Sequence, residues 1–158
     1  MGKGKLQAYM GMARNMATLS PDAETQVGAI MLSEEGRIVA SSFNGFVRGA
    51  VDGSLPTTRP DKYPYIQHAE RNILYNCAYE GIRTKNTTVI CTLSPCVECL
   101  RACFQSGVST IIFDDLYHSF SNTDFYTELD DIFVTVEKVG MFTKLTLMEA
   151  KVREKNND

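Results

Sequence analysis

The sequence of 158 residues contains no apolar run close to the roughly 20 residues that a membrane-spanning helix needs. Its first residues, MGKGKLQAYMGMARN, contain no apolar core of a secretory signal peptide. We therefore expect a single domain over residues 1–158 that works in the cytoplasm without a membrane partner.

Clusters of basic residues are also absent. The chain has 16 Lys and Arg against 19 Asp and Glu, which gives a net charge of −3. A protein that follows a nucleic-acid backbone usually carries a basic stripe, because phosphates dominate the affinity. The sequence therefore predicts no nucleic-acid partner.

A disulfide framework is excluded by the number and context of the cysteines. There are five, an odd number, in a chain that shows no secretion signal. We interpret them as reduced thiols, two of which bind a metal. The other three are expected to be small buried apolar groups: Cys77, Cys91 and Cys103.

Hydrophobic periodicity predicts helices and strands that alternate in the second half of the chain. Alternation of this kind implies right-handed crossovers and parallel pairing. The expected fold is α/β, a three-layer α/β/α sandwich with a mixed five-stranded sheet. A stretch rich in Gly, Pro, Asp and Thr, 45–64, is expected to be a long loop, either functional or disordered. The expected helices are 4–19, 67–80, 95–106 and 122–131, and the expected strands are 25–33, 37–44, 87–93, 109–115 and 132–139.

Two stretches place metal-binding side chains at the starts of predicted helices: HAE from His68, and PCVEC ending at Cys99. Cys96 and Cys99, at i and i+3, share a helix face, and a helix N-terminus favours thiolate over thiol. His68 would complete a Cys₂His set. Three protein ligands with one open position are typical of catalytic rather than structural zinc.

A fourth protein ligand is not expected. Cys103 lies seven residues beyond Cys96, about 10.5 Å of helix rise, whereas two Cys–Zn arms span roughly 9 Å between Cα atoms. The second histidine, His118, follows a different predicted strand.

The order H-x-E…P-C-x-x-C is the signature of zinc deaminases, in which the glutamate transfers protons and is not a ligand. Zinc makes a bound water far more acidic than bulk water. Glu70 beside it could take a proton, pass it to a ring nitrogen and assist the departure of ammonia. We therefore expect one catalytic Zn²⁺ per chain with Glu70 as the proton shuttle.

Four longer stretches together resemble the deoxycytidylate (dCMP) deaminases, including virus-encoded members: TQVGAIML, FNGFVRGAVDG, KYPYIQHAERN and TLSPCVEC. The resemblance runs from about Leu6 to Tyr117. It implies hydrolytic deamination of dCMP to dUMP, which feeds thymidylate synthesis, in the host cytoplasm if the chain is virus-encoded. Val47 departs from the family loop, which often has proline there, and the chain lacks the cysteines and histidines of the second zinc site that some members carry.

The resemblance also implies substrate contacts. Asn44 would bind the deoxyribose 3′-hydroxyl, the backbone N–H of Ala69 would hold the cytosine O2, and the Ser94 carbonyl would accept from the amino group. Two further residues would line the pocket: Val27 and Tyr117. The residues that hold the 5′-phosphate stay open, with three loop residues as candidates: Arg59, Lys62 and Tyr63.

The resemblance further implies regulation, because many members are homohexamers activated by dCTP and inhibited by dTTP. The loop NGFVRGAVDG, whose glycines allow tight turns that expose N–H groups, would hold the effector triphosphate together with Mg²⁺. On the residues alone, a plain glycine-rich surface loop is the better interpretation. The residues implied for this site are Gly45, Arg48, Gly49 and Asp52.

Two other functions remain open at this point. One is a deaminase of tRNA adenosine or of polynucleotide cytidine, since those families resemble the chain at the zinc motif. The other belongs to a different class, a noncatalytic binding module stabilised by zinc. The net charge argues against the first, and the position of Glu70 argues against the second.

Overall fold

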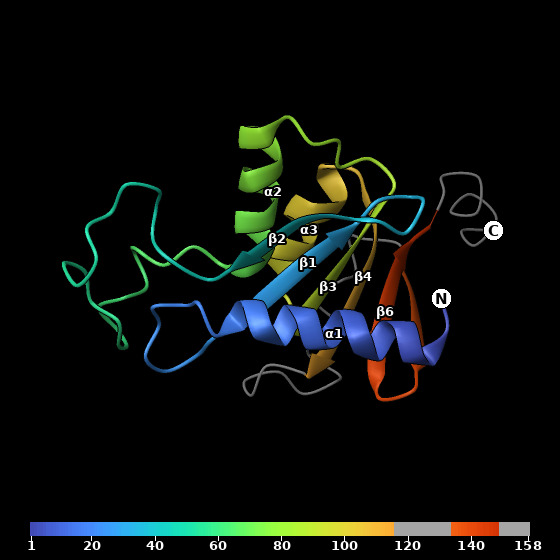
Figure 1. The fold of residues 1–158 in the computed structure, drawn as a ribbon, viewed down its shortest axis with the longest axis horizontal. Helices are drawn as coiled ribbons and strands as arrows, with labels where there is room; N and C mark the ends of the chain where they lie inside the picture. The colour runs from blue at the N-terminus through green and yellow to red at the C-terminus, as the bar shows by residue number, and fades with distance from the viewer. Residues whose placement is uncertain (116–133, 149–158) are drawn as a thin grey trace, which may run out of the picture.

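The computed structural model describes residues 1–115 and 134–148 (Figure 1). The helix predicted at 122–131, together with Tyr117 and His118, lies outside the described residues. None of the described helices combines the length and apolar composition that crossing a membrane requires. The elements are α1 (Lys3–Ala17), β1 (Gly28–Leu32), β2 (Ile38–Phe43), α2 (Ala69–Glu80), β3 (Thr87–Leu93), α3 (Val97–Gln105), β4 (Val108–Asp115), β5 (Val134–Val139) and β6 (Phe142–Leu147).

The sheet is mixed, as the sequence predicts, and its strand order is β2-β1-β3-β4-β6-β5. Strand β1 is antiparallel to both β2 and β3. The predicted parallel pairing is confirmed for β3 and β4, which α3 connects. This pairing brings the C-terminal ends of β3 and β4 to the same side of the sheet.

The predicted count of five strands is wrong, because the described residues form six. Strand β6 follows β5 after two turn residues, and Gly140, the first of them, has φ 66°. Gly at that position is typical of the type II′ turn of a hairpin. Strand β6 buries Phe142 and Leu145 between β4 and β5. Strand β5, whose inner residues are exposed, therefore takes the sheet edge and does not pair with β4.

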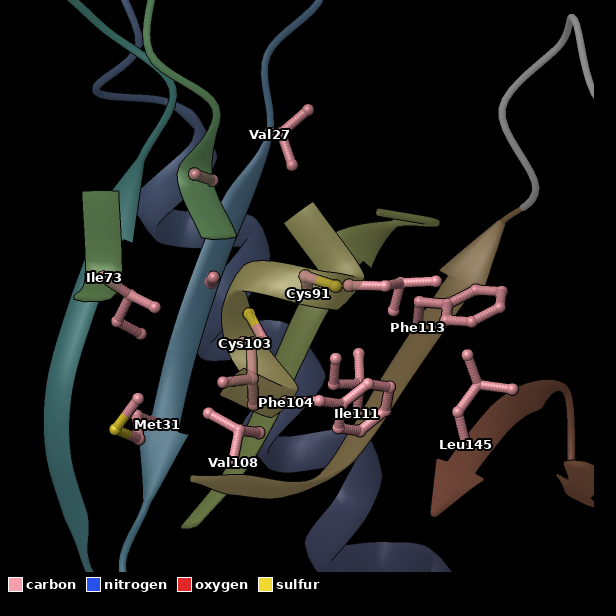
Figure 2. Packing of buried hydrophobic residues seen from close by; sticks show 14 of the residues in the cluster. Val27, Met31, Ile73, Cys91, Cys103, Phe104, Val108, Ile111, Phe113 and Leu145 are labelled. Carbon is pink, nitrogen blue, oxygen red and sulfur yellow. The ribbon is translucent and has the colours of Figure 1, made fainter. Parts of the chain in front are cut away.

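The predicted three layers are present, with α1 on one face of the sheet and α2 and α3 on the other (Figure 1). Side chains alternate along β1 accordingly: Ile30 packs with the α1 cluster, and Met31 with the α2 and α3 cluster. Figure 2 shows the second cluster, where Met31, Ile73 of α2 and Cys103 of α3 meet between the sheet and the helices. The cysteines predicted to be buried and apolar have at most 1% exposure: Cys77, Cys91 and Cys103.

Helix α2 is fastened to the edge strand β2 by side-chain hydrogen bonds. The Asn72 and Asn76 amides donate to the carbonyls of Phe43 and Ser41, at 2.8 and 3.0 Å. These bonds cover outward carbonyls of an edge strand that would otherwise face solvent. They also hold the N-terminus of α2 at the end of β2.

Candidate active site

The ends of three strands and the starts of two helices meet at one edge of the sheet. Gly28, at the start of β1, pairs with Phe43, at the end of β2. Since β3 is antiparallel to β1, its C-terminal end lies at the same edge. The chain passes from β3 through Ser94 into α3, while α2 begins beside β2. Side chains from distant parts of the sequence therefore converge here.

Both predicted ligand stretches lie at helix N-termini. His68 is the N-cap of α2, and Cys96 is the N-cap of α3, so α3 begins two residues later than predicted. The His68 Nδ1 atom lies 3.6 Å from the Cys96 sulfur and 3.4 Å from the Cys99 sulfur. Within residues 1–115 and 134–148, these three side chains are the one cluster whose donor atoms suit a metal, all within 4.8 Å of one another.

Without a bound metal, the sulfurs of Cys96 and Cys99 differ in charge. The Cys99 thiol hydrogen-bonds to Cys96 and lowers the pKa of Cys96 to about 4 against the opposing effect of burial, and His68 contributes further. The pKa of Cys99 is raised by the adjacent Cys96 and by burial. The pair therefore retains one proton, which a divalent cation between the sulfurs would displace. The donor set fits Zn²⁺, which takes cysteine sulfur and histidine nitrogen.

The cluster is open on the histidine side. His68 is exposed, Cys96 is half-buried and Cys99 is buried. The hydrogen bond with Cys96 raises the pKa of His68, so protons compete with a metal for this ring more strongly than usual. Cys103, a residue of α3, is outside the group of donors, and it belongs to the hydrophobic core between α3 and the sheet.

Glu70 stands in the first turn of α2, two residues after His68, and its side chain is 3% exposed. Burial raises the pKa of its carboxyl group above the ordinary value. A carboxylic acid with a raised pKa can both accept and release a proton near neutral pH. Glu70 therefore has the position and the chemistry of a proton shuttle.

A cavity of about 240 Å³ opens beside these residues. Its wall includes Glu70 and two of the three donor residues, so a ligand inside would face the cluster directly. The structure brings to this wall four of the five residues that the resemblance implies for substrate binding: Val27, Asn44, Ala69 and Ser94. The fifth, Tyr117, lies outside the described residues.

The Asn44 side chain is held in one orientation. Its Oδ1 accepts from the Val27 N–H at 2.8 Å, and its Nδ2 donates to the Thr25 carbonyl at 2.8 Å and to Asp22 Oδ2 at 3.4 Å. An amide nitrogen has two hydrogens, and both are used here. The Asn44 side chain can therefore accept one hydrogen bond from a ligand, through the second lone pair of its Oδ1.

Sequence reasoning missed several residues of the cavity wall. The most polar of them is Asp22, which is buried and accepts hydrogen bonds from the N–H groups of Glu24 and Thr25. The sequence SPDAET does carry the signature of an Asx turn, but nothing in it indicates a cavity. The other missed residues of the wall are Thr25, Ile66 and Leu93.

The three phosphate candidates lie differently. Lys62 and Tyr63 line the cavity, and Lys62 is bound to Asp22. Arg59 stands outside it and contacts Glu24, at 3.3 Å, and the Tyr63 hydroxyl, at 2.9 Å. The three residues meet around Glu24, but carboxylates already pair with both cations, Arg59 with Glu24 and Lys62 with Asp22 and Glu24.

The loop residues implied for regulation are not gathered in the cavity. Gly45 is buried and exchanges backbone hydrogen bonds with Gln67, at 3.0 and 2.7 Å. Arg48 lies on the outer face of α2, with its guanidinium 4.0 Å from the centre of the Tyr79 ring. The other two residues are exposed in the loop: Gly49, with φ 90°, and Asp52.

Comparisons with known proteins agree with this geometry. The family model described as the cytidine and deoxycytidylate deaminase zinc-binding region matches residues 3–114. Over 117 residues the chain is 35% identical to the deoxycytidylate deaminase of Pongo abelii, covering 70% of this chain and 65% of that protein. The deoxycytidylate deaminase of Mus musculus is 34% identical over 122 residues, covering 73% and 67%. The chain thus spans about two thirds of the length of these relatives.

A solved structure shares the fold. The crystal structure of the dCMP deaminase from the cyanophage S-TIM5, in complex with dCMP and dUMP, superposes with a TM-score of 0.66 at 27% identity. The match covers 83% of this chain and 93% of that chain. The chain belongs to the family of the cytidine and deoxycytidylate deaminase zinc-binding region.

Proposed function

We propose that the chain is a zinc-dependent hydrolase that converts dCMP and water to dUMP and ammonia, and so feeds thymidylate synthesis. The observation that carries this proposal is the meeting of His68, Cys96 and Cys99 with the buried Glu70 at one cavity. The named relatives support dCMP as the substrate. We place the reaction in the cytoplasm, where free nucleotides are available, and in one domain.

Zn²⁺ held by His68, Cys96 and Cys99 would supply a Lewis acid that makes water nucleophilic at neutral pH. Glu70 would take a proton from that water, deliver it to the ring nitrogen N3 of cytosine, and then assist the departure of ammonia. Its burial suits both steps, because a raised pKa makes the protonated state accessible. The carbon at position 4 gains the water oxygen and loses the amino group.

The remaining wall residues would orient the nucleotide. The Ala69 N–H would hold O2 of the base, and the Ser94 carbonyl would accept from the amino group and so favour cytosine over uracil. Asn44 would accept from the 3′-hydroxyl, because its Oδ1 retains one lone pair and its amide hydrogens are already used. Val27 and Tyr117 would complete the pocket.

The test is ammonia release by the zinc-loaded protein. We expect release from dCMP, and much less from tRNA or single-stranded DNA, because the net charge of −3 offers no basic track for a polynucleotide. Release from a polynucleotide but not from dCMP would favour the alternative deaminase. Stable zinc binding with no ammonia from any substrate would favour the noncatalytic module.

We also propose that the loop around Arg48 binds effector nucleotides, dCTP with Mg²⁺ as activator and dTTP as inhibitor, in a homohexamer. The supporting observation is the paired hydrogen bonds between Gly45 and Gln67, the residue before His68. A ligand that moved the loop at Arg48, Gly49 and Asp52 would therefore act on a segment that leads directly to the site.

A further inference from the structure

We propose that Asp22 and Lys62 are positioning residues that together hold the wall of the cavity in shape without binding the substrate. This inference rests on the proposed function, since it concerns how that reaction's site is held. Asp22 follows α1 and Lys62 stands in the loop before α2, so the pair joins two loops that extend from the same end of the sheet (Figure 1).

The pair is buried and closely bound. Both residues are 3% exposed, and Lys62 Nζ lies 2.8 and 2.9 Å from the two carboxylate oxygens of Asp22. A third acceptor, Oε1 of Glu24, lies 3.5 Å from the same nitrogen. Two carboxylates therefore surround the Lys62 ammonium and offset its charge, which makes it a poor partner for a phosphate.

The carboxylate of Asp22 is equally occupied. Besides Lys62 it accepts from the N–H groups of Glu24, at 2.8 Å, and Thr25, at 3.0 Å, and it faces the Asn44 amide at 3.4 Å. A carboxylate offers about four lone-pair positions, and these contacts use them. Both partners line the cavity, but their short contacts are with each other and with the backbone N–H groups of Glu24 and Thr25.

The contacts close a ring of residues, four of which belong to the cavity wall: Asp22, Asn44, Lys62 and Ile66. From Asp22 the ring passes to the Asn44 amide, along the chain to Gly45, and across the two hydrogen bonds to Gln67. Ile66 then donates its N–H to the Lys62 carbonyl at 3.1 Å, and the Lys62 ammonium returns to Asp22. The ring thus fixes Asn44 and the residue before His68 together.

Loss of Lys62 would leave the buried Asp22 without its cation, and loss of Asp22 would leave Lys62 only the more distant Glu24, at 3.5 Å. A buried charge in that state reorganises its surroundings. The ring would open where it joins the two loops, which displaces Asn44 and the segment leading to His68. All three zinc donors are anchored outside the ring: Cys96 and Cys99 by α3, and His68 by α2, where the Asn72 N–H donates to the His68 carbonyl at 2.9 Å. Zinc should therefore stay bound while the fit of the substrate is lost.

The test compares Lys62→Met, Asp22→Asn and the double variant with wild type. Lys62→Met keeps the length of the side chain and removes its charge. We expect kcat/KM for dCMP to fall roughly 10- to 100-fold, the scale of a small misplacement, mainly through KM and with full zinc content. The kcat/KM for deoxycytidine, which has no phosphate, should fall by the same factor. The double variant buries no charge and should be no worse than the poorer single variant.

The matched control is Arg14→Met, which removes the ion pair of α1 with Asp114; neither of these residues belongs to the cavity wall. It should leave the kinetics unchanged. A loss confined to dCMP would make Lys62 a phosphate ligand and overturn the proposal. Losses that multiply in the double variant would show that the two residues act separately, and would overturn it as well.

A readout without catalysis separates this inference from the proposed function. Hydrogen exchange of the Gly45 and Gln67 amides in the zinc-loaded protein should be faster in Lys62→Met than in Arg14→Met. If wild type released no ammonia from dCMP, the proposed function would fail and the exchange comparison would still test the ring. Equal exchange in the two variants would overturn the ring.

Discussion

His68 and Cys96 occupy the N-cap positions of α2 and α3, where the backbone is extended, and of the two only the Cys96 side chain caps its helix. The Cys96 sulfur accepts from the Cys99 N–H at 3.4 Å, so it replaces the usual oxygen of a cap. This arrangement brings the sulfurs of Cys96 and Cys99 to the same end of α3, facing the start of α2.

Cys99→Ala should remove most of the bound zinc, because two remaining donors leave the metal weakly held. Cys103→Ala is the control, since Cys103 is equally buried in α3 and stands outside the donor cluster. Elemental analysis of the purified variants measures the metal. Full occupancy in Cys99→Ala would remove Cys99 from the ligand set.

Glu70→Gln should keep its zinc and lose roughly 10²–10⁴-fold in rate, the range for a general acid–base group. Glu98→Gln is a close control, because Glu98 has the same position in the first turn of α3 but its side chain is 78% exposed. Steady-state kinetics and metal content are measured for both. Loss of zinc from a folded Glu70→Gln would reassign Glu70 as a ligand.

Cys96 should be the first cysteine that iodoacetamide modifies in metal-free protein at pH 6. With a pKa of about 4 it is a thiolate there, whereas burial raises the pKa values of Cys77, Cys91 and Cys103. The rate of Cys96 modification should fall only as the pH drops through 4, and bound zinc should protect Cys96 from the reagent. Peptide mass spectrometry identifies the site. Equal modification of all cysteines would contradict the proposed charge distribution.

At the scale of elements, the packing of α1 on β1 depends on a missing side chain. A Cβ at Gly28 would stand 1.9 Å from the Ala13 carbonyl oxygen and 2.5 Å from the Ala17 nitrogen. Both atoms belong to the backbone of α1, so no side-chain rotation relieves the contact. Helix α1 can lie this close to the sheet because position 28 is glycine, and β1 leads from the cavity wall at Val27.

Gly28→Ala should therefore lower the free energy of unfolding by about 1–3 kcal/mol, the usual cost of overpacking. Gly11→Ala in α1 is the matched control, since nothing lies within 4 Å of its added Cβ. That change should stabilise the protein by about 0.5–1 kcal/mol, because alanine favours a helix interior. Urea denaturation measures both. A neutral Gly28→Ala would mean that α1 can move away without cost.

At the scale of the whole molecule, regulation would need the loop and the site to change together. We expect the rate to depend sigmoidally on dCMP concentration. Addition of dCTP with Mg²⁺ should make this dependence hyperbolic, and dTTP should lower the rate. Arg48→Ala should weaken both responses and keep zinc, because its contacts are with Asn76 and Tyr79 rather than the cavity. Sedimentation tests whether the chain forms the proposed hexamer. Hyperbolic kinetics indifferent to both nucleotides would leave an unregulated enzyme.

Much of the fold and site could be predicted because the signals are local. The spacing of Cys96 and Cys99 depends on one helical turn, and the buried run 87–93 matches β3 without any shift of its ends. Strand β6 was missed because only one of the two turn residues before it, Gly140, favours a turn, and this is a weaker hairpin signal than Asn-Gly. Its place between β4 and β5 depends on which of two adjacent strands buries more apolar surface.

The amino-acid sequence alone determined the zinc-binding motif, the place of Glu70 in the first turn of a helix, the layers and the family, since each follows from spacing within one element or from matched stretches. Tertiary structure alone decided that Asp22 meets Lys62, 40 residues away, and that this pair joins Asn44 to the segment before His68. A charged residue in a loop is expected to face solvent. Its burial is settled only when a partner of opposite charge arrives from a distant segment, and no local pattern records that meeting.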